Sequence, residues 1–160
     1  MRGTSVRRPP ESGDILRIMA ELDRHRVDYA LIGGAAMALH GFPRMTKDVD
    51  LILPRKAANN GKLLAALEAL REPFQLERIP ARKSLDEGCS TAAEGDLGID
   101  LLFVAASRSF EDYRKHIIEV VVDDVRVKLL DLEGMILSKD TGRPEDVADR
   151  ERLVRLKRRR

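Results

Sequence analysis

The feature that most restricts how this chain can fold is one carboxylate, Asp100, inside the otherwise apolar segment 98–103. Side chains alternate between the two faces of a β-strand, so Asp100 would share a face with Leu102 while Ile99 points to the other side. A charged group in so apolar a strand costs several kcal/mol unless it is paired or binds a metal ion. The fold therefore has to bring either a basic side chain, such as an arginine, or a metal cation to Asp100.

A second acidic pattern lies upstream, where Asp48 and Asp50 flank Val49 at the start of a predicted strand. Strand alternation places both carboxylates on one face. Two ionised carboxylates repel each other there unless a cation lies between them. The pair alone is also compatible with a solvated strand edge, because such short patterns often arise by chance. Asp100 on a neighbouring strand would join all three acids in one site for Mg²⁺ (or Mn²⁺), since magnesium prefers oxygen ligands.

A pair of glycines, Gly33 and Gly34, follows a short apolar segment at 29–32 and precedes a predicted helix. Glycines in such a turn let backbone N–H groups approach an anion closely. Any tight strand-to-helix turn could use the same residues. Because this turn lies shortly before the Asp-x-Asp pattern, it favours a triphosphate held between the glycines and a metal ion.

Lys139 occupies the next position of an apolar helical stripe that begins at Leu132. A lysine on the apolar side of a helix either extends its amine to water near the helix end or meets a buried anion. A phosphate group is the functional interpretation of that anion. Arg44 and Arg143 could also meet phosphate, although exposed arginines are common.

Hydrophobic periodicity and turn residues divide the chain into alternating strands and helices. Strands are predicted over 29–32, 49–53, 74–79, 99–104, 117–122 and 125–130, and helices over 15–22 (capped by Asp14), 35–40, 57–70, 110–116, 132–139 and from Pro144 onward. The last two strands should form a hairpin around Asp123-Asp124, and segment 80–95 is compatible with a strand or a mobile loop. A length of 160 residues suits one α/β (α+β) domain over 12–156, with a flexible N-terminus at 1–11 and a basic tail at 157–160.

Composition narrows the cellular setting. One cysteine excludes an intrachain disulfide and a cysteine-based zinc cluster. No apolar run approaches the ~20 residues of a membrane span, and the N-terminus has no signal-peptide pattern. We therefore expect a cytoplasmic protein without a membrane partner. Aromatic residues make up only 4% of the chain, which argues against several bases stacking on aromatic side chains.

Charge is distributed unevenly along the chain. Segment 150–160 holds seven basic residues and one acidic residue, so the rest of the chain is net acidic although the total charge is +2. A basic terminal segment is often only solvated, but it could also attract an RNA that the acidic body repels.

Three segments together resemble the DNA polymerase β-like nucleotidyltransferase superfamily. They read Leu31-Ile-Gly-Gly-Ala, Arg44-Met-Thr-Lys-Asp-Val-Asp-Leu and Ile99-Asp-Leu-Leu. A fourth, Lys139-Asp-Thr-Gly-Arg-Pro-Glu-Asp-Val-Ala-Asp, resembles more narrowly the small AbiEii-like nucleotidyltransferases of toxin–antitoxin and abortive-infection systems. The resemblance implies the nucleotidyltransferase fold, a mixed β-sheet with flanking helices.

The resemblance also implies a reaction, the transfer of a nucleoside monophosphate from an NTP to a hydroxyl group with release of pyrophosphate. It implies metal ligands at Asp48, Asp50 and Asp100, triphosphate contacts at Gly33 and Gly34, charge stabilisation by Lys139, and positions near the site for Arg44 and Asp146. Asp100 could help to deprotonate the acceptor hydroxyl.

The acceptor stays open, because many relatives carry a large C-terminal helical domain and this chain has little sequence after residue 130. One hypothesis is a toxin that modifies an RNA such as a tRNA. A second is an antitoxin that modifies a protein partner, its cognate toxin. A third is a non-catalytic nucleotide-binding or partner-binding module that retains the fold.

Overall fold

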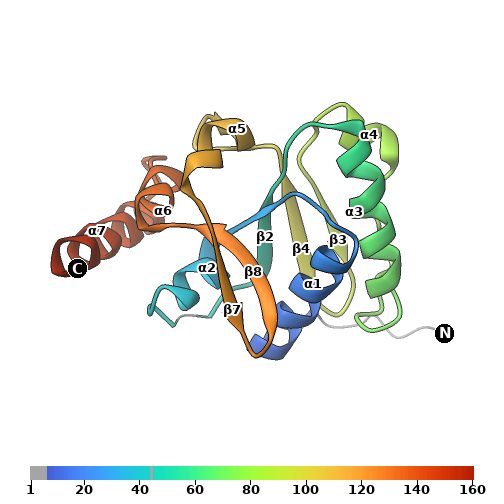
Figure 1. Ribbon diagram of the computed structural model, residues 1–160, viewed down its shortest axis with the longest axis horizontal. Helices are drawn as coiled ribbons and strands as arrows, with labels where there is room; N and C mark the ends of the chain where they lie inside the picture. The colour runs from blue at the N-terminus through green and yellow to red at the C-terminus, as the bar shows by residue number, and fades with distance from the viewer. Residues whose placement is uncertain (1–6, 44) are drawn as a thin grey trace.

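The computed structural model describes residues 7–43 and 45–160. Within these residues, a mixed six-stranded sheet has the order β3-β4-β2-β1-β8-β7 (Figure 1). Its strands are β1 (Ala30–Ile32), β2 (Asp48–Ile52), β3 (Thr91–Glu94), β4 (Gly98–Leu102), β7 (Ile117–Val122) and β8 (Val125–Leu130), and a separate small hairpin consists of β5 (Val104–Ala105) and β6 (Arg108–Ser109). The pairs β1–β8 and β2–β4 are parallel and the others antiparallel. The predicted mixed sheet is confirmed.

Helices flank the sheet at both ends. They are α1 (Ser12–Arg24), α2 (Gly33–Leu39), α3 (Ala57–Leu70), α4 (Arg82–Asp86), α5 (Phe110–Tyr113) with the 3₁₀ turn η1 (Arg114–His116), α6 (Leu132–Ser138) and α7 (Pro144–Arg159). Helix α1 packs against β8 and α3, and α7 packs on α6 and projects from the body (Figure 1). Among the described residues, no helix is both long and apolar enough to cross a bilayer.

The hydrophobic core fixes the two strands that carry the predicted carboxylates. In β2 and β4, Val49, Leu51, Ile99 and Leu101 are fully buried on one face of the sheet. Full burial of such side chains contributes about 1.5–3 kcal/mol each. Because side chains alternate along a strand, this anchoring turns the acidic residues between them to the opposite face.

Helix α1 begins differently from the prediction. The N-cap is Glu11, and Asp14, the expected cap, is the third residue inside the helix. Its carboxylate accepts a hydrogen bond from the Glu11 N–H at 2.8 Å, so the two acids form a capping box. The acidic side chain still satisfies a free N–H at the helix start, but it does so from within the first turn.

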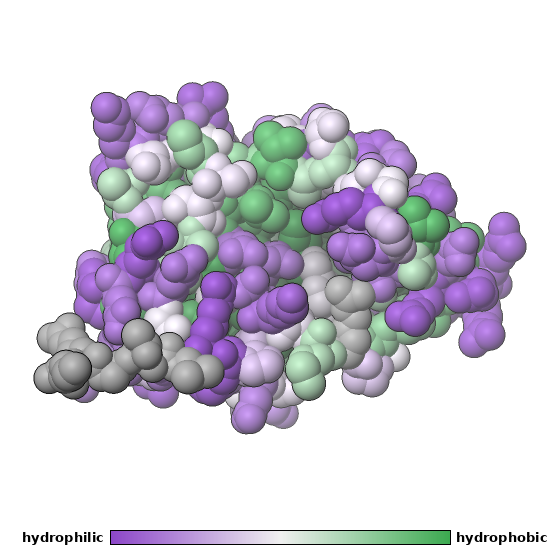
Figure 2. Space-filling view, turned by 180° about the vertical axis from the view of Figure 1, so that it is seen from behind, coloured by the Kyte–Doolittle hydropathy of each residue, from purple (hydrophilic) through white to green (hydrophobic). Residues whose placement is uncertain are grey.

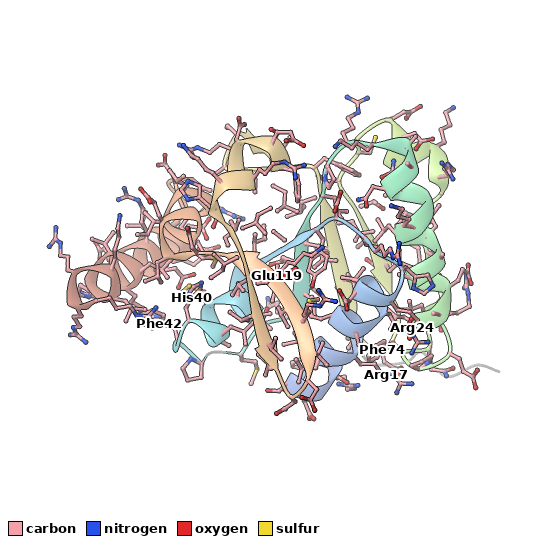
Figure 3. All side chains as sticks on the ribbon, viewed as in Figure 1. Arg17, Arg24, His40, Phe42, Phe74 and Glu119 are labelled. Carbon is pink, nitrogen blue, oxygen red and sulfur yellow. The ribbon has the colours of Figure 1, made fainter. Side chains whose placement is uncertain are left out.

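The segment after α3 shows the largest departure from the predicted elements. The strand predicted over 74–79 does not form, and only Arg78 makes an isolated bridge, with Glu94. Phe74 and Leu76 are buried, but Gln75 between them has a φ of 48°, which an extended strand cannot contain (Figure 3 marks Phe74). The ambiguous segment 80–95 contains the short helix α4 and strand β3.

The predicted hairpin and the two ends of the chain complete the fold. Asp123 and Asp124 connect β7 and β8 with φ values of 48° and 64°, as expected for an aspartate turn. At the N-terminal end, the backbone N–H of Arg8 donates a hydrogen bond to the Asp96 carbonyl oxygen at 2.7 Å. Residues 1–6 lie outside the described residues, and the flexibility of segment 1–11 stays a prediction. At the other end, α7 continues to Arg159, and the predicted basic tail is mostly the last turn of this helix.

Candidate functional site

The three predicted carboxylates come together because β2 and β4 are neighbours in parallel register. Asp50 lies directly opposite Asp100, and Asp48 lies opposite Gly98. Strand alternation puts Asp48 and Asp50 on one face, and the register adds Asp100 to it. The three acids therefore lie on one face of the sheet, although about fifty residues separate the two strands along the chain.

Asp50 and Asp100 form a closely coupled pair. Burial first, and then the hydrogen bond and negative charge of Asp100, raise the pKa of Asp50 to about 8. Burial also raises the pKa of Asp100 above its ordinary range. Without a cation, the pair therefore holds a proton at neutral pH. A divalent metal ion would replace that proton, since it supplies the positive charge that two adjacent carboxylates require.

Asp48 has a different partner in the structure. The Arg7 guanidinium contacts the Asp48 carboxylate and lies 4.0 Å from Glu94. Gly98 makes this contact possible, since a Cβ there would overlap both side chains. No three His, Cys, Asp or Glu side chains of the described residues converge as a ready metal site. The oxygen donors of these carboxylates are of the kind that Mg²⁺ prefers, and in this structure Asp48 is paired with Arg7.

The two glycines are required by close approaches of other side chains. Gly33 has a φ of 70°, and a Cβ on it would overlap the Asp50 carboxylate. A Cβ on Gly34 would lie 2.7 Å from the Thr46 hydroxyl oxygen. Both positions therefore exclude larger residues, and Gly33 lies beside the carboxylate pair. Arg44, the other predicted phosphate contact in this region, lies outside the described residues.

Lys139 does not extend to water. Its side chain is 9% exposed, and its Nζ atom lies 2.9 Å from Asp149 Oδ2 and 3.4 Å from Asp146 Oδ1. It directly follows α6, whereas both acids lie on α7. Lys139 therefore pairs with two carboxylates of the protein itself, and its predicted contact with phosphate stays a prediction.

Asp146 connects this lysine to two further side chains. Its carboxylate accepts hydrogen bonds from the Thr141 hydroxyl at 2.5 Å and from Arg143 Nε at 2.9 Å. Burial alone would raise the pKa of Asp146, but the Thr141 hydrogen bond and the charges of Lys139 and Arg143 lower it below the ordinary value. Asp146 therefore stays ionised and fixes the cationic groups around it.

A cavity of about 390 Å³ joins the carboxylate pair to the lysine cluster. It is lined by Ile32, Gly33, Asp50, Asp100, Leu102, Val104, Ala105, Ala106, Ser138, Lys139, Thr141, Arg143 and Asp146. One wall is apolar, from the ends of β1, β4 and β5, and the other is charged. Asp48 and Gly34 are not among the lining residues. The volume is in the range of small-molecule sites.

Several lining or supporting residues were not assigned roles from the sequence. Asp149 holds Lys139, and the signal for it was its spacing of three residues from Asp146, which puts both acids on one face of a helix. Ala106 and Ser107 form the tight turn between β5 and β6, with φ values of 49° and 61°. No sequence signal marks this turn, because neither residue type favours positive φ.

Comparison with protein families gives one match over most of the chain. A family model described as "Nucleotidyltransferase of unknown function (DUF6036)" matches residues 14–155. No curated protein matches the chain in sequence.

Solved structures of nucleotidyltransferases have a similar fold. An antigenic nucleotidyltransferase-like protein from Paracoccidioides brasiliensis is 21% identical with a TM-score of 0.54, over 93% of this chain and 79% of that one. A putative nucleotidyltransferase from Thermotoga maritima is 16% identical with a TM-score of 0.53, over 95% and 98% of the two chains. ANT(2″)-Ia, in complex with adenylyl-2″-tobramycin, is 17% identical with a TM-score of 0.53, over 90% and 92%. The predicted fold is confirmed, whereas no match bears on the AbiEii-like resemblance.

Proposed function

Because the chain belongs to the DUF6036 family of nucleotidyltransferases, we propose that it transfers a nucleoside monophosphate from an NTP to a hydroxyl group, with release of pyrophosphate. The acceptor hydroxyl belongs to an RNA, such as a tRNA, or to a protein. The observation that carries the proposal is the pairing of Asp50 with Asp100 in a cavity that also contains Lys139. Adjacent half-buried acids are costly for a fold, and a site for cations would explain why they lie together.

In this proposal Asp48, Asp50 and Asp100 are ligands of Mg²⁺ or Mn²⁺. When bound, such ions neutralise charge on the attacking and leaving oxygens of an in-line displacement. Asp100, which lines the cavity together with Asp50, would accept the proton of the acceptor hydroxyl. Asp48 would exchange the Arg7 guanidinium for a metal ion.

The charged wall of the cavity would receive the triphosphate. Lys139 and Arg143 are the cations there, and Asp146 keeps both in place. Gly33 would allow the phosphates to approach the backbone, and Gly34 and Arg44 remain proposed contacts beside it. The apolar wall formed by Ile32, Leu102 and residues 104–106 would face the nucleoside. Positioning and charge neutralisation would supply most of the catalysis.

The resemblance of segment 139–149 to AbiEii-like enzymes supports a cytoplasmic role in a toxin–antitoxin or phage-defence system. The chain would then act on, or together with, a cognate toxin or antitoxin. A second candidate function is nucleotide or partner binding without catalysis. The contact between Arg7 and Asp48 favours it, since it satisfies one of the three acids without metal.

The decisive experiment incubates the protein with Mg²⁺ and each α-labelled NTP, alone, with total RNA, and with lysate protein. The proposal expects a covalent label on RNA or protein that disappears in Asp50→Asn and Asp100→Asn. The matched control is Asp124→Asn, which removes an equal charge from the distant β7–β8 turn and should label fully. NTP binding without transfer to any acceptor would support the non-catalytic alternative instead.

A further inference from the structure

A second groove, separate from the carboxylate cavity, lies between α7 and the loop that follows α2. Its volume is about 540 Å³, and it is lined by His40, Gly41, Phe42, Arg152, Arg155, Leu156, Arg159 and Arg160. None of these residues lines the carboxylate cavity. His40 and Phe42 lie beside α7 in Figure 3. Figure 2 shows hydrophilic residues gathered at the end of the molecule where α7 projects.

The arginines of this groove are largely uncompensated. Arg152 lies 3.8 Å from Asp149, whereas Arg155, Arg159 and Arg160 have no acidic partner among the described residues. Arg152, Arg155 and Arg159 are spaced by three and four residues, which puts them on one face of α7. At a rise of 1.5 Å per residue, the Cα atoms of neighbouring arginines lie about 4.5–6 Å apart along the helix axis.

The floor of the groove is apolar and small. It consists of Phe42 and Leu156, both half-buried, and the ring of His40, whose Nε2 lies 2.7 Å from the Leu130 carbonyl oxygen. A helix docking on α7 would need apolar anchors at successive turns. In this groove α7 contributes a single apolar residue, Leu156, and its other groove-lining residues are arginines. The groove therefore suits a chain of anions with one ring-stacking position better than an amphipathic helix.

Two helices connect this groove to the carboxylate cavity. Helix α2 begins at Gly33 in the cavity and ends beside His40, and α7 begins beside Arg143 and Asp146 in the cavity and ends in the groove. From Asp146 to Arg155, α7 rises about 14 Å. At about 3.4 Å per nucleotide of a stacked strand, this distance corresponds to roughly four phosphates.

We propose that the groove binds the phosphate backbone of a single-stranded nucleic acid and directs a terminal hydroxyl of that strand towards the carboxylate cavity. Guanidinium groups bind phosphate oxygens through two parallel hydrogen bonds, which makes arginine suited to this ligand. Phe42 offers one face for a base. The second half of the proposal rests on the proposed nucleotidyl transfer, whereas the binding of the strand does not.

The test measures fluorescence anisotropy of a labelled single-stranded RNA and the corresponding DNA against salt concentration. The variant Arg155→Gln/Arg159→Gln removes two groove charges, and Lys157→Gln/Arg158→Gln removes two charges that do not line the groove. Since all four side chains are exposed, both variants should fold. We expect the groove variant to lower the salt slope by about 1.4, at about 0.7 per phosphate on a single strand. The control variant should keep the wild-type slope.

Equal slopes for the two variants would overturn the proposal, because binding would then depend on total charge alone. No binding of either strand at low salt would also overturn it, as would Arg155- and Arg159-dependent binding of an acidic peptide in place of nucleic acid. RNA bound in preference to DNA would support an RNA acceptor. Two results separate the proposals. Asp50→Asn should bind the strand as tightly as the wild type does. If the wild type binds RNA through the groove but transfers no label, only the transfer proposal fails.

Discussion

Asp50 shows at the residue scale how the fold and the proposed site impose opposite requirements. The core needs its neighbours Val49 and Leu51 buried, which carries the acid into a partly buried position opposite Asp100. Burial favours the protonated acid, whereas metal binding requires the ionised form. The same residue would therefore link the stability of the protein to pH and to the proposed metal ion.

We predict that the metal-free protein loses stability as the pH rises. The pKa of Asp50 is raised from 3.8 to about 8, so between these values the folded state holds a proton that the unfolded state lacks. The free energy of unfolding then falls with rising pH across this window. Urea titrations between about pH 5.5 and pH 8.5 should show this slope for the wild type and a flatter one for Asp50→Asn. A slope shared by both proteins would contradict the assignment to Asp50.

Arg7 gives a second prediction at the same scale. Because its guanidinium would compete with the proposed metal ion for Asp48, Arg7→Ala should bind Mn²⁺ more tightly, as measured by titration calorimetry. Exposed ion pairs contribute up to about 1 kcal/mol, which corresponds to about a fivefold gain in affinity. Arg8→Ala is the control, since Arg8 pairs with Asp14 instead. Equal affinities for Arg7→Ala and the wild type would show that Arg7 does not compete.

At the scale of elements, the junction of α6 and α7 depends on one ion cluster. Lys139 directly follows α6, and Asp146 and Asp149 lie in the first two turns of α7. Their ion pairs are buried, so removing one partner leaves a charge uncompensated. The cluster positions the start of α7 beside the cavity, although most of the helix projects from the body (Figure 1).

Lys139→Met should therefore destabilise the protein by about 3 kcal/mol, because the buried carboxylates of Asp146 and Asp149 would lose the cation that they share. The melting temperature should fall by about 10 °C in calorimetry. The double variant Lys139→Met/Asp149→Asn should recover part of this loss, since it removes one of the two buried negative charges that Lys139 compensates. Lys157→Met serves as an exposed control without effect on the melting temperature. A Lys139→Met protein as stable as the wild type would mean that the cluster contributes nothing to the junction.

At the scale of the whole molecule, the acidic cavity and the groove lined by arginines lie in different parts of the fold. The carboxylate cavity lies at the ends of the central strands, and the arginine groove lies along the projecting helix. The net acidic body would repel a nucleic acid, whereas the C-terminal half of α7 would attract it. Of the predicted basic tail, Arg159 and Arg160 line the arginine groove, while Lys157 lies 3.8 Å from Glu133.

Binding of an NTP with Mg²⁺ should stabilise the entire domain, because the cavity is assembled from β1, β2, β4 and the α6–α7 junction. At a ligand concentration of about 100 times Kd, the gain is about 2.7 kcal/mol. The melting temperature should rise by about 5–10 °C with both components and much less with either alone. Asp100→Asn should abolish the shift. A shift of equal size in Asp100→Asn would place the nucleotide elsewhere.

Local pattern was sufficient wherever a feature depends on the residue and its near neighbours. Alternation put Asp48 and Asp50 on one face, periodicity predicted helix 57–70 at its observed bounds, and Asp123-Asp124 marked a hairpin turn. Each of these follows from dihedral preferences or side-chain spacing over a few residues. The family resemblance added the nucleotidyltransferase fold.

Only the tertiary structure decided which groups meet. The register of two distant strands set Asp50 against Asp100, and the packing of α7 on α6 gave Lys139 its carboxylate partners. The chain also makes a turn at Gln75 in place of the predicted strand at 74–79, although Phe74 and Leu76 are both buried as that strand would require. Sequence spacing determines which face of an element a side chain occupies. Its neighbour on that face depends on how the elements pack in the core, because the total burial of many distant residues selects the arrangement.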